Sequence, residues 1–72
     1  MSDLEPGYYE ATKDDTTPPA YFHVSDEGGL TLRYPSGETH TGRGALILLQ
    51  SDLLPVCSVE EVPVEETPFD DE

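Results

Sequence analysis

Positive charge is scarce in this 72-residue chain: against sixteen Asp and Glu residues it carries only Lys13, Arg33 and Arg43, so its net charge is −13. Proteins that bind DNA or RNA place Lys and Arg side chains against the phosphates, and three scattered cations do not outweigh sixteen carboxylates. The same shortage excludes attraction to an anionic membrane surface. The sequence therefore excludes direct nucleic-acid and membrane binding and favours a basic partner, whose approach this charge accelerates.

Cysteine and long apolar runs are scarce as well. Cys57 is the only cysteine, so no internal disulfide can form, although chains this short commonly need disulfides, a metal or oligomerisation. The longest apolar run, residues 45–49, is far shorter than the roughly 20 residues of a membrane span. Residues 1–10 carry acids where a secretory signal has a basic start and an apolar run. These features predict a soluble, cytoplasmic protein.

Residues for catalysis or metal binding are also few. A single small domain leaves no room for a deep substrate cleft, and without tryptophan there is no platform for a sugar. His23, His40 and Cys57 are the only soft or borderline metal ligands, and their intervals of 17 residues lack the close pairing of a zinc site. No segment has the spacing of a calcium-binding loop. We therefore predict no enzymatic activity, no metal and no cofactor.

Residues 35–44, PSGETHTGRG, come close to the GxxxxGK[ST] phosphate-binding loop. Arg43 stands where that loop has lysine, and Gly44 stands where it needs a Ser or Thr to hold magnesium. We therefore interpret the stretch as a hairpin turn, an edge strand and a glycine-flanked corner. On a chain this acidic, we expect Arg43 to pair with a carboxylate of its own chain.

The clearest pattern between residues 7 and 59 is a series of short alternating runs separated by Gly and Pro. The glycines of DEGG, residues 26–29, allow a hairpin turn, and Pro35 and Gly37 allow a second one. The strand after that second turn is polar throughout and is expected at an edge. The predicted strands are GYYEAT (7–12), AYFHVS (20–25), LTLRY (30–34), ETHT (38–41) and VCSVEEV (56–62).

One element, GALILLQ at residues 44–50, is ambiguous. A five-residue apolar run fits a strand buried on both faces and equally fits one or two turns of a core helix. Because Gly42 and Gly44 weaken a helix start, we favour the strand for residues 45–50. Residues 51–54, which precede Pro55 and open with Ser and Asp, predict a short helical turn.

The predicted fold is therefore all-β: five or six short strands in an antiparallel meander or a small SH3-like barrel, with a short helical turn. Residues 1–6 are expected to be flexible and residues 7–59 to form the β domain. Residues 60–72 carry seven acids, no base and two prolines. We expect this tail to be disordered or extended when free, because it has too few apolar side chains to offset its ordering entropy.

The tail nevertheless combines its acids with apolar residues and ends in TPFDDE. In composition it resembles the acidic C-terminal tails of single-stranded-DNA-binding proteins, which end in aspartates beside a Pro-Phe pair and dock onto basic pockets. In those tails the pair follows the acids, whereas here Pro68 and Phe69 precede them, so the docking mode is not carried over. The alternative is a tail that only keeps the protein soluble.

In its small size, extreme acidity and lack of a catalytic constellation, the whole chain resembles the small acidic inhibitors and nucleic-acid mimics that bacteriophages encode. The resemblance is one of composition and rests on no motif. It implies that carboxylates replace phosphates in the basic cleft of a nucleic-acid-binding protein. The residues expected to contact such a basic partner are Asp14, Asp15, Asp26, Glu27, Glu60, Glu61, Glu65, Glu66, Phe69, Asp70, Asp71 and Glu72.

The alternative function is a structural or accessory subunit of a phage particle or another complex, in which the acids only solubilise the surface. A β edge or one face of the GALILLQ segment would then form the interface. The two hypotheses differ in the fate of the apolar side chains. An apolar patch that stays exposed favours the subunit or a homo-oligomer, whereas a fully closed core favours the acidic interaction module.

Overall fold

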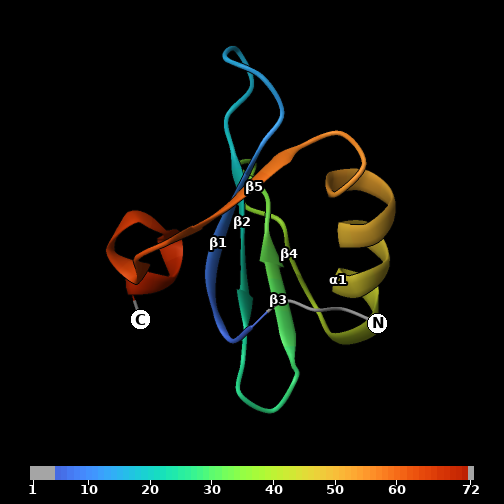
Figure 1. Ribbon diagram of the computed structural model, residues 1–72, viewed down its shortest axis with the longest axis vertical. Helices are drawn as coiled ribbons and strands as arrows, with labels where there is room; N and C mark the ends of the chain where they lie inside the picture. The colour runs from blue at the N-terminus through green and yellow to red at the C-terminus, as the bar shows by residue number, and fades with distance from the viewer. Residues whose placement is uncertain (1–4, 72) are drawn as a thin grey trace.

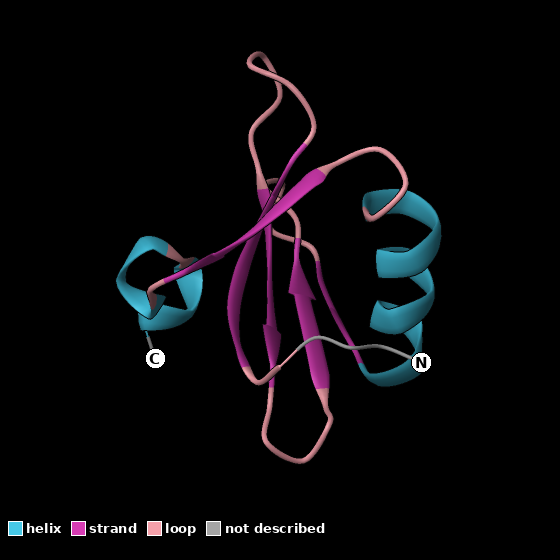
Figure 2. Ribbon diagram, viewed as in Figure 1, coloured by secondary structure: helices cyan, strands magenta, loops and turns pink. Residues whose placement is uncertain are grey.

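The computed structural model describes the backbone of residues 5–71 and the side chains of residues 5–69. Five antiparallel strands form one sheet in the order β4-β3-β2-β1-β5, and one helical segment lies against a face of it (Figures 1 and 2). The strands are β1 (Gly7–Thr12), β2 (Ala20–Val24), β3 (Leu30–Arg33), β4 (Thr39–Thr41) and β5 (Ser58–Val62). The helical elements are α1 (Gly42–Leu48), η1 (Leu49–Leu53), η2 (Val64–Glu66) and η3 (Pro68–Asp71).

The first four strands form the predicted meander, and β5 returns beyond the helix to pair with β1. Tyr9 lies opposite Phe22 of β2 on one side and opposite Glu61 of β5 on the other. β4 and β5 therefore occupy opposite edges of an open sheet. The predicted antiparallel β fold is confirmed in that the structure is mostly β, although it is not all-β. Among the described residues the sheet does not close into an SH3-like barrel.

The two predicted hairpin turns are present and depend on glycine. The amide of Gly28 donates to the carbonyl of Ser25 at 3.0 Å, and Gly28 has a φ of 88°. The amide of Gly37 donates to the carbonyl of Tyr34 at 2.9 Å, with a φ of 104° at Gly37. Both φ values lie in the left-handed region, which L side chains avoid. Residues 35–44 thus form a turn, the edge strand β4 and the first residues of α1, rather than a nucleotide-binding loop.

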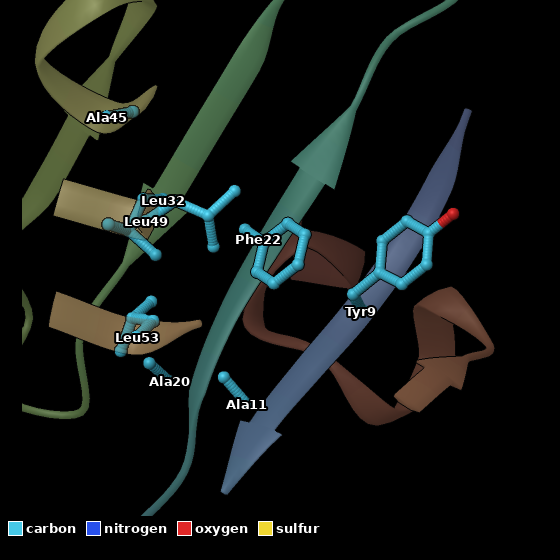
Figure 3. Close-up of a cluster of buried hydrophobic side chains, with 8 residues drawn as sticks. All are labelled: Tyr9, Ala11, Ala20, Phe22, Leu32, Ala45, Leu49 and Leu53. Carbon is cyan, nitrogen blue, oxygen red and sulfur yellow. The ribbon is translucent and has the colours of Figure 1, made fainter. Parts of the chain in front are cut away.

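The core lies between the helix and the inner face of the sheet, the face that carries Phe22 and Leu32 (Figure 3). These two side chains are fully buried, and the Tyr9 ring stacks on Phe22 with centroids 5.1 Å apart. Strand alternation sends every second residue to this face, which the helix then shields from water. The buried residues are Tyr9, Ala11, Ala20, Phe22, Leu32, Ala45, Leu49 and Leu53.

The strand predicted for residues 45–50 is wrong, because these residues belong to α1 and η1. Ala45, Leu49 and Leu53 are buried at intervals of four residues, which places them on one side of a helix. The amide of Leu54 donates to the carbonyl of Leu49 at 2.8 Å, five residues back. The helical turn predicted at residues 51–54 is therefore the wide end of this longer helical segment.

The disorder predicted for residues 60–72 is not what the structure shows for residues 60–71. Glu60–Val62 pair with β1, and η2 and η3 follow. The Thr67 side chain is buried and donates from Oγ1 to the carbonyl of Val64 at 2.8 Å, which closes the turn. The predicted disorder is not confirmed, because Phe69 has aromatic partners on the outer face of the sheet, opposite the helix. Glu72 lies outside the described residues.

The N-terminal segment is described only in part. Of the residues predicted to be flexible, 1–4 lie outside the described residues. The Tyr9 hydroxyl donates to the carbonyl of Glu5 at 2.6 Å, which ties residue 5 to β1. Burial, helped by the charges of Glu61 and Glu5, raises the pKa of Tyr9, so this hydroxyl stays protonated at neutral pH.

Candidate acidic interaction surface

The loop and turn acids lie at opposite ends of the sheet. Asp14 and Asp15 are exposed in the β1–β2 loop, whereas Asp26 and Glu27 are exposed in the β2–β3 turn (Figure 1). The five residues of β2 span about 15 Å, and the β1–β2 loop projects beyond this strand, so the two pairs are farther apart than the length of β2 (Figure 1). The structure therefore does not bring these four predicted contact residues into one patch.

Asp14 orders its own loop. Its Oδ1 accepts hydrogen bonds from the amide of Thr17 at 2.8 Å and from the amide and hydroxyl of Thr16 at 2.9 Å each. Hydrogen bonds from Thr17 and Thr16 lower the pKa of Asp14, because they favour the charged carboxylate. The charge at this loop tip is therefore fixed in place before any partner arrives.

Three carboxylates gather on the outer face of the sheet, and we call Glu10, Glu60 and Glu66 the acidic cluster. Glu10 of β1 lies directly opposite Glu60 of β5. The Tyr21 hydroxyl donates to Oε2 of Glu10 at 3.3 Å. Burial raises the pKa of Tyr21, and the charge of Glu10 raises it further. Glu66 lines the same surface pocket as Tyr21 and Arg33. Sequence analysis missed Glu10, because only the pairing of β5 with β1 places it beside Glu60.

The other acids of this region point elsewhere. Glu61 follows Glu60 in β5 and faces the inner side, where its carboxylate lies beside Gly7 and Tyr9. Glu65 is exposed on η2. Adjacent residues of a strand face opposite sides, so the predicted pair Glu60 and Glu61 serves two different surfaces.

Phe69 is packed against its own sheet rather than free for a partner. Its ring centroid lies 5.8 Å from that of Tyr8 and 6.2 Å from that of His23, and those two rings stack on each other at 4.3 Å. The Arg33 guanidinium carbon lies 6.0 Å from the centre of the Phe69 ring. This docking holds η2, and with it Glu66, on the outer face. The side chains of Asp70, Asp71 and Glu72 lie outside the described part of the chain.

The carboxylates have almost no cations of their own. Among the side chains of residues 5–69, the only contact within 4.0 Å between a basic side-chain nitrogen and a carboxylate oxygen joins His40 Nε2 and Glu38 Oε1 at 3.6 Å. The expected pairing of Arg43 with a carboxylate is absent from this part of the chain, since Arg43 is exposed on α1. The described acids therefore have no Lys or Arg ion-pair partner within the described side chains, although some accept hydrogen bonds from Thr or Tyr.

One surface cleft adjoins two of the predicted contact residues. A cleft of about 570 Å³ lies between the start of β1 and the β2–β3 turn. Asp26, Glu27 and His23 contribute to its walls, and no Lys or Arg lines it. The cleft therefore suits a basic side chain, whose charge would meet carboxylates on one wall.

The three candidate metal ligands lie apart. His23 stacks on Tyr8 on the outer face, and His40 lies edge-on to Tyr34, with ring centroids 5.7 Å apart. Cys57 is half-buried beyond the helix. Burial raises the pKa of Cys57, and the charge of Asp52 adds to the shift, so the thiol is protonated at neutral pH. Within residues 5–71 no three His, Cys, Asp or Glu residues group as metal ligands.

A second surface is apolar. The sequence analysis placed it only on one face of residues 44–50, without naming side chains. Four large side chains on and just after the helix stay exposed: Leu46, Ile47, Leu54 and Val56. We call them the helix face. Because residues 45–50 were expected to form a strand, their division into a buried side and an exposed side was not foreseen.

Comparisons with protein-family models, with curated proteins and with solved structures found no match to this chain. In the described residues, no helix has the length and apolar character needed to cross a membrane.

Proposed function

We propose that this protein is a non-enzymatic acidic interaction module that binds a basic protein partner. The observation that supports the proposal is the acidic cluster, in which Glu10 and Glu60 face each other and neither forms an ion pair with a described side chain. Like charges directly opposite each other on a sheet are destabilising. A Lys or Arg side chain of a partner, placed between these carboxylates, would remove the repulsion and add attraction.

The finer proposal is that the partner is a nucleic-acid-binding protein and that the carboxylates stand in for phosphates. The net charge of −13 is carried by a body whose longest dimension is 34 Å. This amounts to about one charge per 3 Å, the same order as the one per 1.7 Å of double-stranded DNA. The acids at both ends of the sheet and on its outer face would then contact separate parts of one basic cleft.

The test begins with the immobilised protein and a lysate at low salt, followed by elution with a salt gradient. We expect a basic nucleic-acid-binding protein to elute at moderate salt, because exposed charge pairs are screened beyond about 8 Å at physiological ionic strength. Added duplex DNA should compete with the captured protein. If that protein binds equally well in the presence of saturating DNA, mimicry is wrong even though acidic binding stands.

A double variant tests whether the acidic cluster contacts the basic partner. The double variant Glu10→Gln and Glu60→Gln removes two charges from the acidic cluster, and we expect it to elute at lower salt than the wild type. The double variant Glu5→Gln and Glu38→Gln removes two exposed charges outside the predicted contact residues and serves as the control for net charge. Equal elution of the Glu10→Gln and Glu60→Gln variant and the wild type would show that the acidic cluster is not the binding site.

The second candidate function is the accessory subunit of a phage particle or another complex. The helix face supports it, because an exposed apolar patch is the feature that favours a subunit. In this case a partner would stay bound at high salt and would be released by changes in the helix face instead of the acidic cluster.

A further inference from the structure

The edge of the sheet formed by β5 has no strand beside it. β5 is five residues long and contains no proline and no lysine, whereas β4 at the opposite edge has only three residues. Short strands, prolines and lysines are common devices that keep the edge of a sheet from pairing with another chain. β5 has none of the three. It is therefore the edge of this sheet that is open to the addition of a strand.

The backbone hydrogen bonds of the sheet alternate in direction along each strand. Residues opposite each other in an antiparallel pair of strands alternate between pairs that exchange backbone hydrogen bonds and pairs that do not. The amide of Ser25, just after β2, donates to the carbonyl of Gly29 at 2.9 Å. Every second residue of β2, counted back from Ser25, therefore directs its amide and carbonyl toward β3. The residues between them, which include Phe22, direct theirs toward β1.

The same alternation continues through β1 to β5. Tyr9 lies opposite Phe22 and is directed toward β2. Glu10, the next residue, is directed toward β5, where it lies opposite Glu60. The two neighbours of Glu60 in β5 therefore direct their amides and carbonyls away from β1, to the free edge of the sheet. Those neighbours are Val59 and Glu61. Outside the strand ladders, no backbone hydrogen bond between described residues engages these groups.

Charge decides what can pair with this edge. Glu60 lies on the outer face of the sheet beside Glu10, and Glu61 lies on the inner face beside Tyr9, so β5 presents a carboxylate on each face. A second copy of this chain would bring its own glutamates to the same edge, and like charges placed opposite each other destabilise a sheet. Lys and Arg placed opposite these glutamates stabilise it. The edge therefore disfavours a second copy and favours an extended basic segment.

We propose that the basic partner adds such a segment to β5 as a sixth, antiparallel strand. The inference rests on the proposed function and states how the partner binds. The segment exchanges backbone hydrogen bonds with Val59 and Glu61. Glu60 then lies in a pair without hydrogen bonds, in which opposite Cα atoms approach to about 4.5 Å. A Lys or Arg at this position lies beside Glu60, on the same face as Glu10, and offsets the repulsion between the two carboxylates.

The two faces of β5 also set the sequence that fits. A basic residue opposite Glu61 lies on the inner face, and the next residue, opposite Glu60, is the basic one of the outer face. The residue after that lies opposite Val59, which packs partly buried against the core. An apolar side chain there extends the core, since cross-strand pairs of this kind stabilise a sheet. Read from its N-terminus, the segment is therefore basic, basic and apolar.

Peptides with blocked amides separate strand addition from attraction by charge alone. The probe is the peptide Thr-Lys-Lys-Val-Thr with capped ends, titrated into the full chain at low salt and followed by NMR. Methylation of the backbone nitrogens of the first Lys and of Val blocks the edge that faces β5. Methylation of the second Lys and of the last Thr blocks the other edge at equal charge. We expect the first modification to weaken binding at least about tenfold and the second only about twofold, because only the first removes hydrogen bonds to β5.

A pair of protein variants makes the same separation from the other side. Glu61→Pro removes an amide that faces the free edge, and Glu61→Gln removes the same charge but keeps that amide. We expect Glu61→Pro to bind the unmodified peptide at least about fivefold more weakly than Glu61→Gln does. The wild type supplies a measurement that needs no variant. In the free protein, amide hydrogen exchange should be faster at Val59 and Glu61 than at Glu60, and the bound peptide should slow both.

Three results overturn strand addition while the proposed function stands. One is equal binding of the two methylated peptides, which would show that charge alone holds them. Another is exchange at Val59 and Glu61 that the bound peptide leaves unchanged. The third is the absence of peptide binding up to about 1 mM, although the immobilised chain still captures a basic protein from a lysate. If neither the peptide nor a basic protein binds, the proposed function is wrong and the inference is lost with it.

Discussion

Replacement of Phe69 by alanine tests whether the acidic tail is part of the fold. A fully buried Phe→Ala change costs about 3–5 kcal/mol. Phe69 is half-buried, and its ring contacts Tyr8, His23 and the Arg33 guanidinium on one side. We therefore expect a loss of about 2 kcal/mol, of which about 1 kcal/mol comes from the aromatic pairs.

This loss is large for so small a chain. At about 0.05–0.15 kcal/mol per residue, 72 residues have a free energy of unfolding of about 4–10 kcal/mol. A loss of about 2 kcal/mol should lower the melting temperature by roughly 10 °C, since domains of this size shift by about 4–8 °C per kcal/mol. Urea unfolding followed by tyrosine fluorescence and far-UV circular dichroism measures the change.

Two further measurements separate docking from a general loss of stability. In Phe69→Ala, amide hydrogen exchange of residues 64–69 should become fast while β2 and β3 stay protected, because only η2 and η3 lose their contact. Phe69→Leu keeps apolar burial without ring stacking and should recover about half of the lost stability. If Phe69→Ala keeps both the wild-type urea midpoint and the wild-type exchange pattern, the tail is disordered, as its composition suggests, and the docking is refuted.

The structure determines whether two further changes raise or lower the free energy of unfolding: a rise in pH, through Tyr34, and the substitution Glu10→Gln. Burial and the hydrogen bond to Asp52 raise the pKa of Tyr34 from 10.0 to about 12. The hydroxyl therefore loses its proton at a higher pH in the folded state than in the unfolded chain. The free energy of unfolding is unaffected below pH 10, and it falls by up to about 1.4 kcal/mol per pH unit as the pH rises from 10 to about 12. Urea midpoints of Tyr34→Phe should fall less steeply over this range, and equal slopes would contradict the assignment. Glu10→Gln relieves the repulsion from Glu60 and should add roughly 0.2–1 kcal/mol to the free energy of unfolding at low salt, with the gain lost at high salt; a drop in urea midpoint at low salt would count against the acidic cluster.

The hairpins could be predicted because their determinants are local. Alternation within LTLRY fixes which side chains face the core, and Gly28 and Gly37 fix where the chain turns. Only a few consecutive residues decide each of these features, so no knowledge of distant contacts is needed. The antiparallel meander of β1 to β4 follows from them.

The helix could not be predicted in the same way, because a run of five apolar residues has no period of its own. The sheet decides between the alternatives: its inner face carries Phe22 and Leu32, and an open sheet needs a second layer to bury them. Only α1 and η1 supply one. Ala45, Leu49 and Leu53 are spaced by four residues in the sequence, whereas the predicted strand rested on Gly42 and Gly44, which weaken a helix start.

The acidic cluster could not be predicted from the sequence for a different reason. Glu10 and Glu60 are 50 residues apart, and they meet because β5 skips the meander and pairs with β1. A local pattern cannot choose the strand with which a last strand pairs. The acids of the loop and the turn, by contrast, were found from the sequence because turns are exposed wherever the strands lie.

The tail joins the fold to the proposed function. Its acids gave it the composition of a disordered segment, yet Phe69 covers the outer face of the sheet and holds Glu66 at the pocket that Tyr21 also lines. Glu10 and Glu60, however, are held by the β1–β5 pairing and not by the tail. Phe69→Ala should therefore weaken binding of a basic partner less than the Glu10→Gln and Glu60→Gln pair does. If Phe69→Ala weakens binding more than the Glu10→Gln and Glu60→Gln pair does, the binding site lies on the tail instead of the strands.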